Sequence, residues 1–411
     1  MRKGIIGSVG ALLVCVGGIL GQEPPPVVTQ GAEVGPAPVV IFDRSIQNTR
    51  SSWGGAEFLL WRLKSPPVPV PLITINDNPA SIAALNEAGT RVLFGNGSNE
   101  STNLDWSAGM RFTLGGWRDD EQMFGWEASG FVLERRSLIY HNATAGGANP
   151  VLGVPANSIV PFTSNGGVFN PAGETSLNSG GNATRISAHL NARLWGAEAN
   201  GVVNLWRNDR VQVTGLVGFR YLDLVENLSL STTIDGGAPA SFVYVNDSFA
   251  TRNQFYGGQV GARVDFTRGR WHLDTTAKMA LGSTHQVMNL VGESSFITGG
   301  APTFTTPQGV FVESTNGGRF NRNVFAVVPE VQVNLGYQWT PGIRPFIGYN
   351  WMYLSNAARP GDQIDRNVNP TQQPAFTLGG GALVGPPAPL PTFRSGEFWA
   401  QGFNLGVEIR Y

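Results

Sequence analysis

The sequence predicts an all-β protein: a transmembrane, antiparallel, up-and-down β-barrel of about ten strands (ten to twelve). Three observations predict it. Many segments alternate apolar with polar side chains, which gives a strand two unlike faces. Short and long connections between these segments also alternate along the chain. After residues 1–21 no apolar run is long enough for a membrane helix, so a spanning chain would have to close a sheet on itself.

The chain begins with features of a secretory signal. Arg2 and Lys3 precede an apolar stretch from Ile5 to Leu20, and we expect cleavage near Gly21. We therefore divide the chain into a signal peptide (1–21), a Pro-rich flexible leader (22–50) and an outer-membrane β-barrel (51–411).

The only cysteine lies inside the signal. Cys15 follows Val14, whereas a lipoprotein signal needs a small residue there, so we do not expect lipidation. Cleavage would leave a mature chain that has no disulfide and no thiol chemistry.

Ten segments read as barrel strands. In the second of them, Leu104, Trp106 and Ala108 alternate with Asp105 and Ser107. The ten segments are 53–62, 104–114, 124–136, one within 184–206, 211–224, 256–266, 271–281, 325–339, 344–354 and 397–411. The last one alternates from Phe403 to a terminal Tyr411, which resembles the C-terminal signature of bacterial outer-membrane barrels. We expect the barrel-assembly machinery to bind it.

One segment does not alternate in a single phase. Ile186, Leu190 and Leu194 share one face, and then Trp195 and Val203 share the other. A one-residue slip moves every side chain to the opposite face. The segment therefore holds a bulge near Leu194, or it is two strands and the barrel has twelve. We keep ten.

The connections alternate in length. Short connections fall at 115–123, 207–210, 267–270 and 340–343, and long ones at 63–103, 137–183, 225–254, 284–324 and 355–396. Bacterial barrels have short periplasmic turns and long extracellular loops. The order of lengths then places both ends of the barrel in the periplasm.

All eleven tryptophans lie in or near the predicted strands. Aromatic girdles at the two membrane interfaces would place them there. An ordinary preference of tryptophan for strands explains each single position equally well.

The polar face of the strands carries the candidate functional residues. By alternation the lumen-lining set is Arg111, Glu127, Arg220, Arg263, Asp265, Asp274, Lys278, Glu330, Glu408 and Arg410, with Gln332 and Asn334. In an open pore these charges would tune ion selectivity, and in a closed barrel they would pair and fill the lumen. Ten strands allow a narrow passage at most, because open channels are typical of 16–18 strands.

Signatures of other chemistry are weak. The four histidines (141, 189, 272 and 285) lack zinc-ligand spacing, and we expect His272 to make a hydrogen bond in the lumen. No Gly-x-Ser-x-Gly or P-loop motif occurs. Ser283 and His285 are a weak candidate for a hydrolase pair. We expect no enzyme, no metal and no cofactor, and a net charge of −1 does not indicate nucleic-acid binding.

Three motifs resemble one known family. They are Ala56-Glu57-Phe58-Leu59-Leu60-Trp61 followed by Pro71-Leu72-Ile73-Thr74, then Gly218 to Leu224 with Glu226, and Arg359-Pro360-Gly361-Asp362-Gln363-Ile364-Asp365-Arg366. They resemble the planctomycete putative β-barrel porin family, type seven, over most of residues 53–411. The resemblance implies an outer-membrane β-barrel and says little about cargo.

The last of these motifs has two readings. Asp362 and Asp365 supply the hard oxygen ligands that calcium prefers. Pro360-Gly361 instead specifies a turn, and Arg359 and Arg366 can neutralise the acids, which we favour. We expect this loop to pack on or into the barrel mouth.

These patterns predict a protein of the bacterial outer membrane that contacts membrane lipid. The favoured function is a narrow, passive channel for small polar solutes or ions. The alternative is a non-conducting barrel that works through its extracellular loops, and the third and weakest is a barrel-embedded hydrolase.

Overall fold

The computed structural model describes residues 52–96, 98, 102–147, 149–163, 169–178, 182–236, 241–299, 301–373 and 384–411. The predicted signal peptide and leader lie outside these residues. Residues 49–411 form one compact unit. Within the described ranges, no helix has both the length and the apolar character to cross a membrane.

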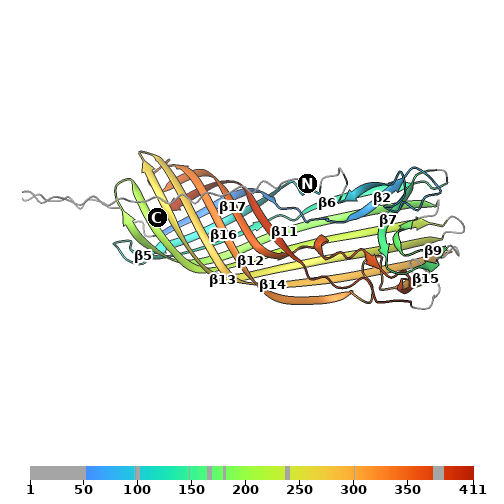
Figure 1. The fold of residues 1–411 in the computed structure, drawn as a ribbon. Coiled ribbons are helices and arrows are strands. Elements are labelled where there is room, and N and C mark those ends of the chain that lie inside the picture. The colour runs from blue at the N-terminus through green and yellow to red at the C-terminus, as the bar shows by residue number, and fades with distance from the viewer. Residues whose placement is uncertain are drawn as a thin grey trace, which may run out of the picture. The chain divides into compact units, whose positions relative to one another are not determined.

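Ten antiparallel strands form a closed ring (Figure 1). They are β1 (Ser52–Leu63), β4 (Trp106–Trp117), β5 (Phe124–Leu133), β11 (Ala183–Arg207), β12 (Val211–Asp235), β13 (Phe242–Arg268), β14 (Trp271–Thr298), β16 (Gly318–Tyr337), β17 (Ile343–Ala358) and β19 (Ser395–Arg410). Each strand pairs with the next in this order, and β19 pairs with β1. Every ring strand therefore has partners on both sides, which confirms the predicted barrel of about ten strands.

Short turns join the strands at one end of the barrel. They fall between β4 and β5, β11 and β12, β13 and β14, and β16 and β17, as the sequence predicts. The chain also enters and leaves the barrel at this end, because the Ser52 amide donates to the Tyr411 carbonyl at 3.1 Å. We call this the short-turn end and the opposite one the long-loop end.

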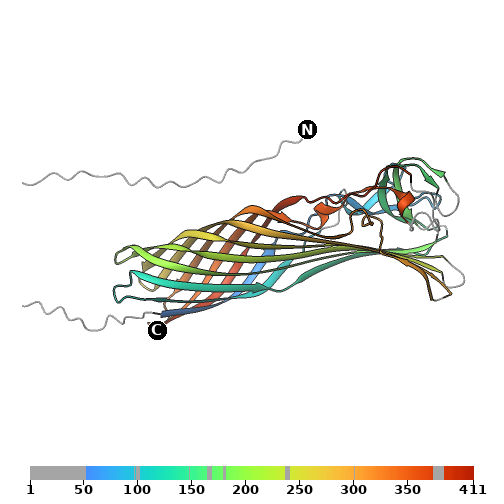
Figure 2. The same cartoon turned by 90° about the horizontal axis from the view of Figure 1, so that it is seen from below.

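The long connections hold far more regular structure than expected. β12 and β13 continue through most of the segment 225–254, and β14 extends to Thr298 within the segment 284–324, although the sequence assigns both segments to loops. Together with β11 and β6 (Arg136–Thr144) they form an open sheet beyond the barrel (Figure 2). The alternation persists in these segments, but its apolar side faces inward there, which is why it was not recognised.

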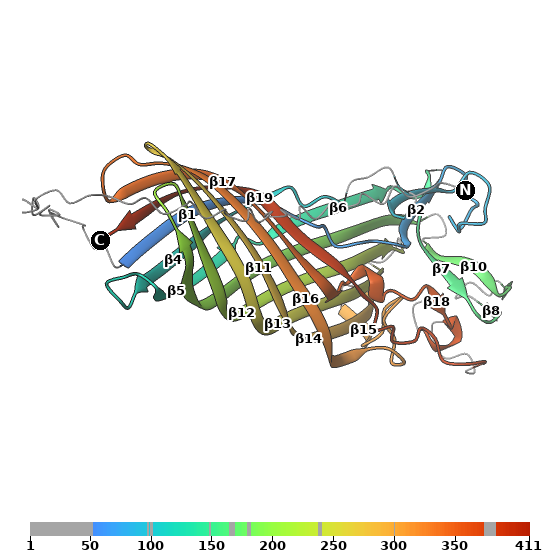
Figure 3. The same cartoon turned by 60° about the vertical axis from the view of Figure 1, so that its left-hand side comes forward.

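Smaller elements cover the inner side of this open sheet at the end opposite the C-terminus (Figure 3). A second sheet contains β2 (Pro71–Asn76), β3 (Arg91–Gly95), β7 (Val151–Ser158), β10 (Gly173–Asn178) and β18 (Asn367–Val368). The remaining elements are β8 (Phe162–Thr163), β9 (Phe169–Asn170), β15 (Ala301–Thr306), and the 3-10 helices η1 (Gly361–Gln363) and η2 (Pro370–Gln372). We call these elements, β6 and the parts of β11–β14 beyond the barrel the extension.

The extension is packed around a hydrophobic core that continues into the barrel. Its two layers bury apolar side chains from the open sheet, including Ile186, Leu190, Leu228, Phe249 and Leu290, and from the small sheet, including Leu72, Ile73, Phe94, Leu152 and Val154. Fully burying one such side chain stabilises a fold by roughly 1.5–3 kcal/mol. This core explains why the extension is folded structure and not a set of loops.

An exposed apolar band surrounds the barrel wall. On β12, Val217 and Phe219 point outward and are 65% and 53% exposed. The next residue on this strand, Arg220, faces inward and is 4% exposed. The band is continued by Met110, Phe112, Val260, Leu281, Phe325, Ile347, Phe403 and Leu405. On β11 to β14 it covers about eleven residues per strand, close to the ~9–11 needed to cross a bilayer.

The phase change within 184–206 is neither a bulge at Leu194 nor a pair of strands. β11 is continuous, and its register with β12 first shifts between Asn204 and Trp206. Even-numbered residues face inward along its length: Leu190 and Leu194 near one end, Glu198 and Asn200 near the other. The strand keeps one alternation along its length. Along the chain, the apolar side chains change near Trp195 from the inward face, which belongs to the core, to the outward face, which belongs to the exposed band.

Candidate functional site

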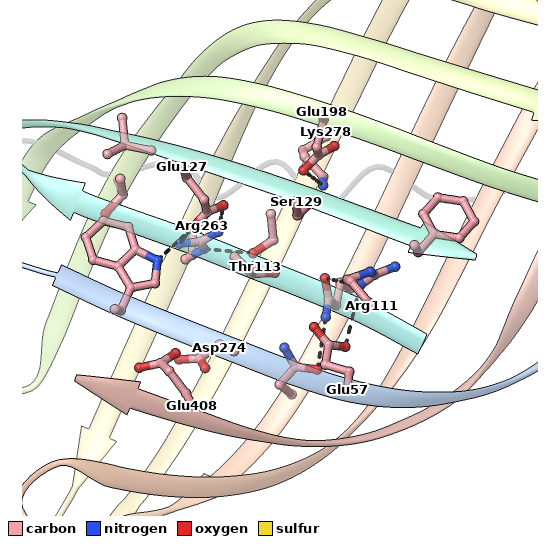
Figure 4. A pocket seen from close by; sticks show the side chains of 18 of the residues that line it. Glu57, Arg111, Thr113, Glu127, Ser129, Glu198, Arg263, Asp274, Lys278 and Glu408 are labelled. Atoms are coloured by element: carbon pink, nitrogen blue, oxygen red, sulfur yellow. Dashed lines mark hydrogen bonds and ion pairs between the residues drawn. The ribbon is translucent and has the colours of Figure 1, made fainter. Parts of the chain in front are cut away.

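All ten charged residues of the predicted lumen-lining set border one cavity inside the barrel, as do Gln332 and Asn334. Figure 4 shows several of them pointing into this space from β4, β5, β13, β14 and β19. The cavity measures about 160 Å³ for the centres of water molecules, which is room for on the order of ten waters.

The middle of the lumen is crossed by ion pairs. The Arg220 guanidinium donates to Glu198 at 2.6 Å and also contacts Glu330. Lys278 Nζ lies 2.7 Å from Glu198 and 3.3 Å from Glu330. Arg111 lies 3.6 Å from both Glu57 and Glu330. We call these six residues the central charge layer, whose three acids and three bases neutralise one another.

Two members of this layer were missed from the sequence. Glu198 lies where the alternation of β11 seemed to change phase, and Glu57 belongs to a motif that was read only as a family marker. Reading β11 in one phase would have found Glu198. Removing one partner of such a buried pair costs about 3–5 kcal/mol, because it leaves an uncompensated charge.

An apolar layer fills the lumen between the central charge layer and the long-loop end. Apolar inward residues follow the charged ones toward the long-loop end, as Leu59 and Trp61 follow Glu57 on β1 and Leu222 and Leu224 follow Arg220 on β12. We call this layer the apolar plug. Its members are Leu59, Trp61, Leu133, Leu194, Leu222, Leu224, Phe255, Ala280, Val328, Met352, Leu354 and Phe398, none more than 2% exposed.

The plug and the charge layer are in direct contact. The Arg111 guanidinium carbon lies 5.3 Å from the centre of the Trp61 ring and 5.8 Å from that of Phe131. Such cation–π contacts strengthen when water is excluded. The sequence predicted charged residues along the lumen, with an open and a filled lumen both possible. It did not predict the apolar plug toward the long-loop end.

The family loop motif lies over the plug. Arg359 is 1% exposed and Glu226, its partner from β12, is 0% exposed. The Arg359 Nη2 donates to Glu226 Oε1 at 2.7 Å and to the Lys64 carbonyl at 2.8 Å, while Nη1 donates to the Glu397 carbonyl at 2.9 Å. One side chain thereby joins β12, β1 and β19 across the barrel mouth.

The rest of the motif fixes the turn after Arg359. Pro360 precedes η1, and a Cβ added to Gly361 would lie 1.8 Å from the Pro67 carbonyl oxygen, so only glycine fits. The Gln363 amide donates to the Arg359 and Arg394 carbonyls at 2.9 and 2.8 Å. Ile364 is buried.

The two acids of the motif have different surroundings. Asp365 accepts from the Asn367 and Leu390 amides at 3.0 and 3.2 Å, and burial raises the pKa of Asp362. Arg366 pairs with Glu174 at 2.7 Å and does not neutralise either acid. No group of three or more metal-ligand side chains occurs in the part of the chain that the structure describes.

Three tryptophans do not belong to a girdle. Trp61 lies in the plug, and Trp53 and Trp117 face into the cavity at the short-turn end. Their ring centres are 5.7 Å apart, and Trp53 Nε1 donates to Glu127 at 3.3 Å. The girdle interpretation is therefore wrong for these three. Trp195 does point outward, and its ring packs against Tyr221 at an angle of 49° between the ring planes.

The remaining candidates lie outside the cavity lining. Ser283 and His285 are on the outward face of β14, where the His285 ring contacts Asn323 at 2.8 Å. His272 lies at the short-turn end, 3.0 Å from Thr267 Oγ1. The structure does not assemble Ser283 and His285 into the cavity.

Comparison with known proteins identifies the family. The model of the family described as Putative beta barrel porin-7 (BBP7) matches residues 53–411. The chain belongs to the BBP7 family. The three motifs that resemble this family converge at one place in the structure, since Trp61, Glu226 and Arg359 all lie at the plug or directly over it. No curated protein matches the chain.

Several solved structures are similar at low identity. The outer membrane protease OmpT from Escherichia coli is 9% identical, covers 89% of this chain and 98% of its own, and has a TM-score of 0.39. A Pseudomonas aeruginosa FadL homologue is 10% identical over 87% and 90% of the two chains, with a TM-score of 0.25. The channel DcaP of Acinetobacter baumannii is 8% identical over 88% and 96%, with a TM-score of 0.18. The observed ring of strands, and not these scores, carries the fold assignment.

One expectation needs correction. The sequence led us to expect that the chain is not an enzyme, and an outer-membrane protease among the similar structures contradicts that exclusion. A barrel architecture gives no ground for ruling out catalysis. The family match, together with the observed ring of strands, assigns this chain to the outer-membrane β-barrels.

Proposed function

We propose that this BBP7 barrel does not conduct ions while the apolar plug fills its lumen. We also propose that it holds the extension at the cell surface as an interaction module. The apolar plug is the observation that carries the proposal. Ions cross hydrated passages, and an apolar constriction opposes them by excluding water. The plug offers no polar lining, and Arg359 covers it at the long-loop end.

The extension supports the second half of the proposal. It is a two-layered structure whose hydrophobic core continues into the barrel, so its exposed faces keep a fixed shape. Binding residues are often displayed on segments that a rigid scaffold positions. In bacterial barrels the long-loop end is extracellular, which would present the extension to the outside of the cell.

A second candidate is a narrow, passive channel for small polar solutes or ions. The charged cavity at the short-turn end favours it, because such linings are typical of conducting lumens. This function would require the plug to move aside.

We also propose how the chain is exported and which components of the membrane it contacts. Membrane lipid would surround the exposed apolar band, and the barrel-assembly machinery would recognise β19, whose outward residues alternate with polar ones. Secretion would depend on cleavage of a signal peptide within residues 1–21. We expect no nucleic-acid partner, and the net charge of −1 agrees with that expectation.

Planar-bilayer conductance of the refolded residues 22–411 tests the proposal. We expect no discrete conductance steps from the wild-type chain. The double variant Trp61→Ala, Phe398→Ala opens the plug and should conduct. Phe403→Ala is the matched control, because this residue faces outward from the same strand as Phe398. Steps from the wild type would favour the channel, and heat-modifiable gel migration would verify folding of each variant.

A further inference from the structure

The part of the cavity between the central charge layer and the short-turn end has a chemistry of its own, which goes beyond the proposed function. We call this part the vestibule. Trp53, Trp117, Glu127, Asp265, Asp274 and Glu408 border it, together with three arginines. Figure 4 shows Glu127 and Arg263 facing each other, with Asp274 and Glu408 nearby.

Each vestibule arginine is paired with a carboxylate. Arg263 makes a bidentate contact with Glu127, with distances of 2.9 and 2.7 Å. Arg344 lies 3.2 Å from Asp274 and 2.7 Å from Glu408, and Arg410 also contacts Glu408. These arginines already have anionic partners, so an added anion would have to displace a carboxylate.

One carboxylate is in excess. Among the ion pairs of the described residues, none involves Asp265, so the vestibule has four acids for three bases. Asp265 lies directly opposite Asp274 across β13 and β14. Like charges in directly opposed positions destabilise a sheet. Asp274 Oδ1 is buried and accepts no hydrogen bond from any donor that the structure describes. Asp265 and Asp274 interact through their side chains, and two carboxyls can share a hydrogen bond only when one of them holds a proton. The acidic wall therefore has a place for one positive charge, which a proton or an added cation can supply.

The opposite wall is aromatic. Trp53 and Trp117 lie on β1 and β4, five strands around the ring from β13 and β14, which carry Asp265 and Asp274. Their ring planes meet at 52°, so the pair forms an angled surface beside the cavity. The negative faces of indole rings attract cations, and quaternary ammonium groups are typical ligands of such surfaces.

We propose that the vestibule binds a small organic monocation of the quaternary ammonium class between the Trp53–Trp117 pair and the Asp265–Asp274 pair. Charge selects a cation, because the surplus group is a carboxylate. The indole faces select an organic cation with apolar methyl groups. The vestibule is the part toward the short-turn end of a cavity of about 160 Å³ in all, which provides the space. Access is from the short-turn end, so binding does not depend on whether the plug opens.

Isothermal titration calorimetry of the refolded protein in detergent tests this site. The probe is choline, and its neutral isostere 3,3-dimethyl-1-butanol has the same shape without the charge. We expect saturable binding of choline, competition by tetramethylammonium, and no measurable binding of the isostere. Absence of saturable choline binding, or equal binding of the isostere, overturns the proposal.

Matched variants locate the site. Asp265→Asn and Trp117→Leu should each weaken choline binding between about 2-fold and 30-fold, the range expected for one cation contact. Asp209→Asn, in a short turn, and Trp126→Leu, on the outward face of β5, are the controls and should bind as the wild type does. Choline binding that is unchanged in both vestibule variants contradicts the site. Conductance reports on the proposed function separately, because neither vestibule variant alters the plug.

Discussion

At the scale of single residues, the most informative side chain is Arg359. It belongs to the motif with the most specific family resemblance, and it is buried against Glu226 with three further carbonyl and ring contacts. The sequence predicted that this loop packs at the barrel mouth, and the structure places Arg359 there. The sequence did not reveal its partner, because Glu226 is 133 residues away and only the fold brings them together.

Replacing Arg359 should strongly destabilise the chain. Arg359→Ala leaves Glu226 buried without a counter-charge, so we expect a loss of about 3–5 kcal/mol in the free energy of unfolding. The control is Arg91→Ala, whose partner Asp77 is 69% exposed in an exposed pair and should cost less than about 1 kcal/mol. Urea unfolding in lipid vesicles measures both, and equal losses would show that Arg359 has no special role.

Two buried acids of the extension give its stability a pH dependence. Burial raises the pKa of Glu313 to about 10, with a further contribution from Asp247. Burial also raises the pKa of Asp247 to about 6, although it accepts hydrogen bonds from the Val310, Phe311 and Val312 amides. On β13 the exposed apolar band begins at Tyr256. Asp247 lies nine residues before it, roughly 30 Å along the strand, and is therefore outside the band.

The direction of the pH dependence follows from these shifts. A carboxyl that holds its proton more tightly when folded stabilises the fold most below its unfolded pKa, and this contribution is lost as pH rises through the folded pKa. We expect residues 308–317 to exchange amide hydrogens faster, after correction for intrinsic rates, at pH 9 than at pH 5. Glu313→Gln should remove most of the difference, whereas no change in the wild type would refute the assignment.

At the scale of elements, β11 shows what alternation can and cannot predict. The ten strands and four short turns were predictable, because period-2 patterns and turn residues are local signals. The inversion of the two faces near Trp195 was not, since the pattern alone does not say which face is buried. The small sheet was missed for a different reason: β2 and β7 are short and pair across 79 positions, as between Thr74 and Gly153.

The inversion predicts where β11 leaves the membrane. The expected mature chain has no cysteine, so single cysteines can be introduced without background. Asn191→Cys lies on the outward face beyond Trp195 and should react with a membrane-impermeant maleimide on intact cells. Ala199→Cys lies on the outward face within the apolar band and should not react. Equal labelling of the two positions would contradict the boundary.

At the scale of the whole molecule, the lumen is divided into layers along the barrel axis. A vestibule, the central charge layer, the apolar plug and the Arg359 contacts follow one another from the short-turn end to the long-loop end. The sequence identified the charged residues of this lumen by alternation. It did not show that they pair with one another, because the partners come from strands far apart in the chain, as Glu127 and Arg263 do.

The layers also explain why three separate family motifs lie together. Trp61, Glu226 and Arg359 come from three parts of the chain. Glu226 and Arg359 are each other's partners, and Trp61 lies in the plug that Arg359 covers. Closure of the lumen is therefore a property of the whole barrel, and no single strand could have revealed it.

Conductance across a planar bilayer is the most direct measurement of that closure. If the plug closes the lumen, the folded wild-type chain should give no discrete current steps. Such steps should occur only after Trp61 and Phe398 are both replaced by alanine. Stable, ohmic steps from the wild-type chain would show that ions pass the plug, and the closed barrel described above would then be wrong.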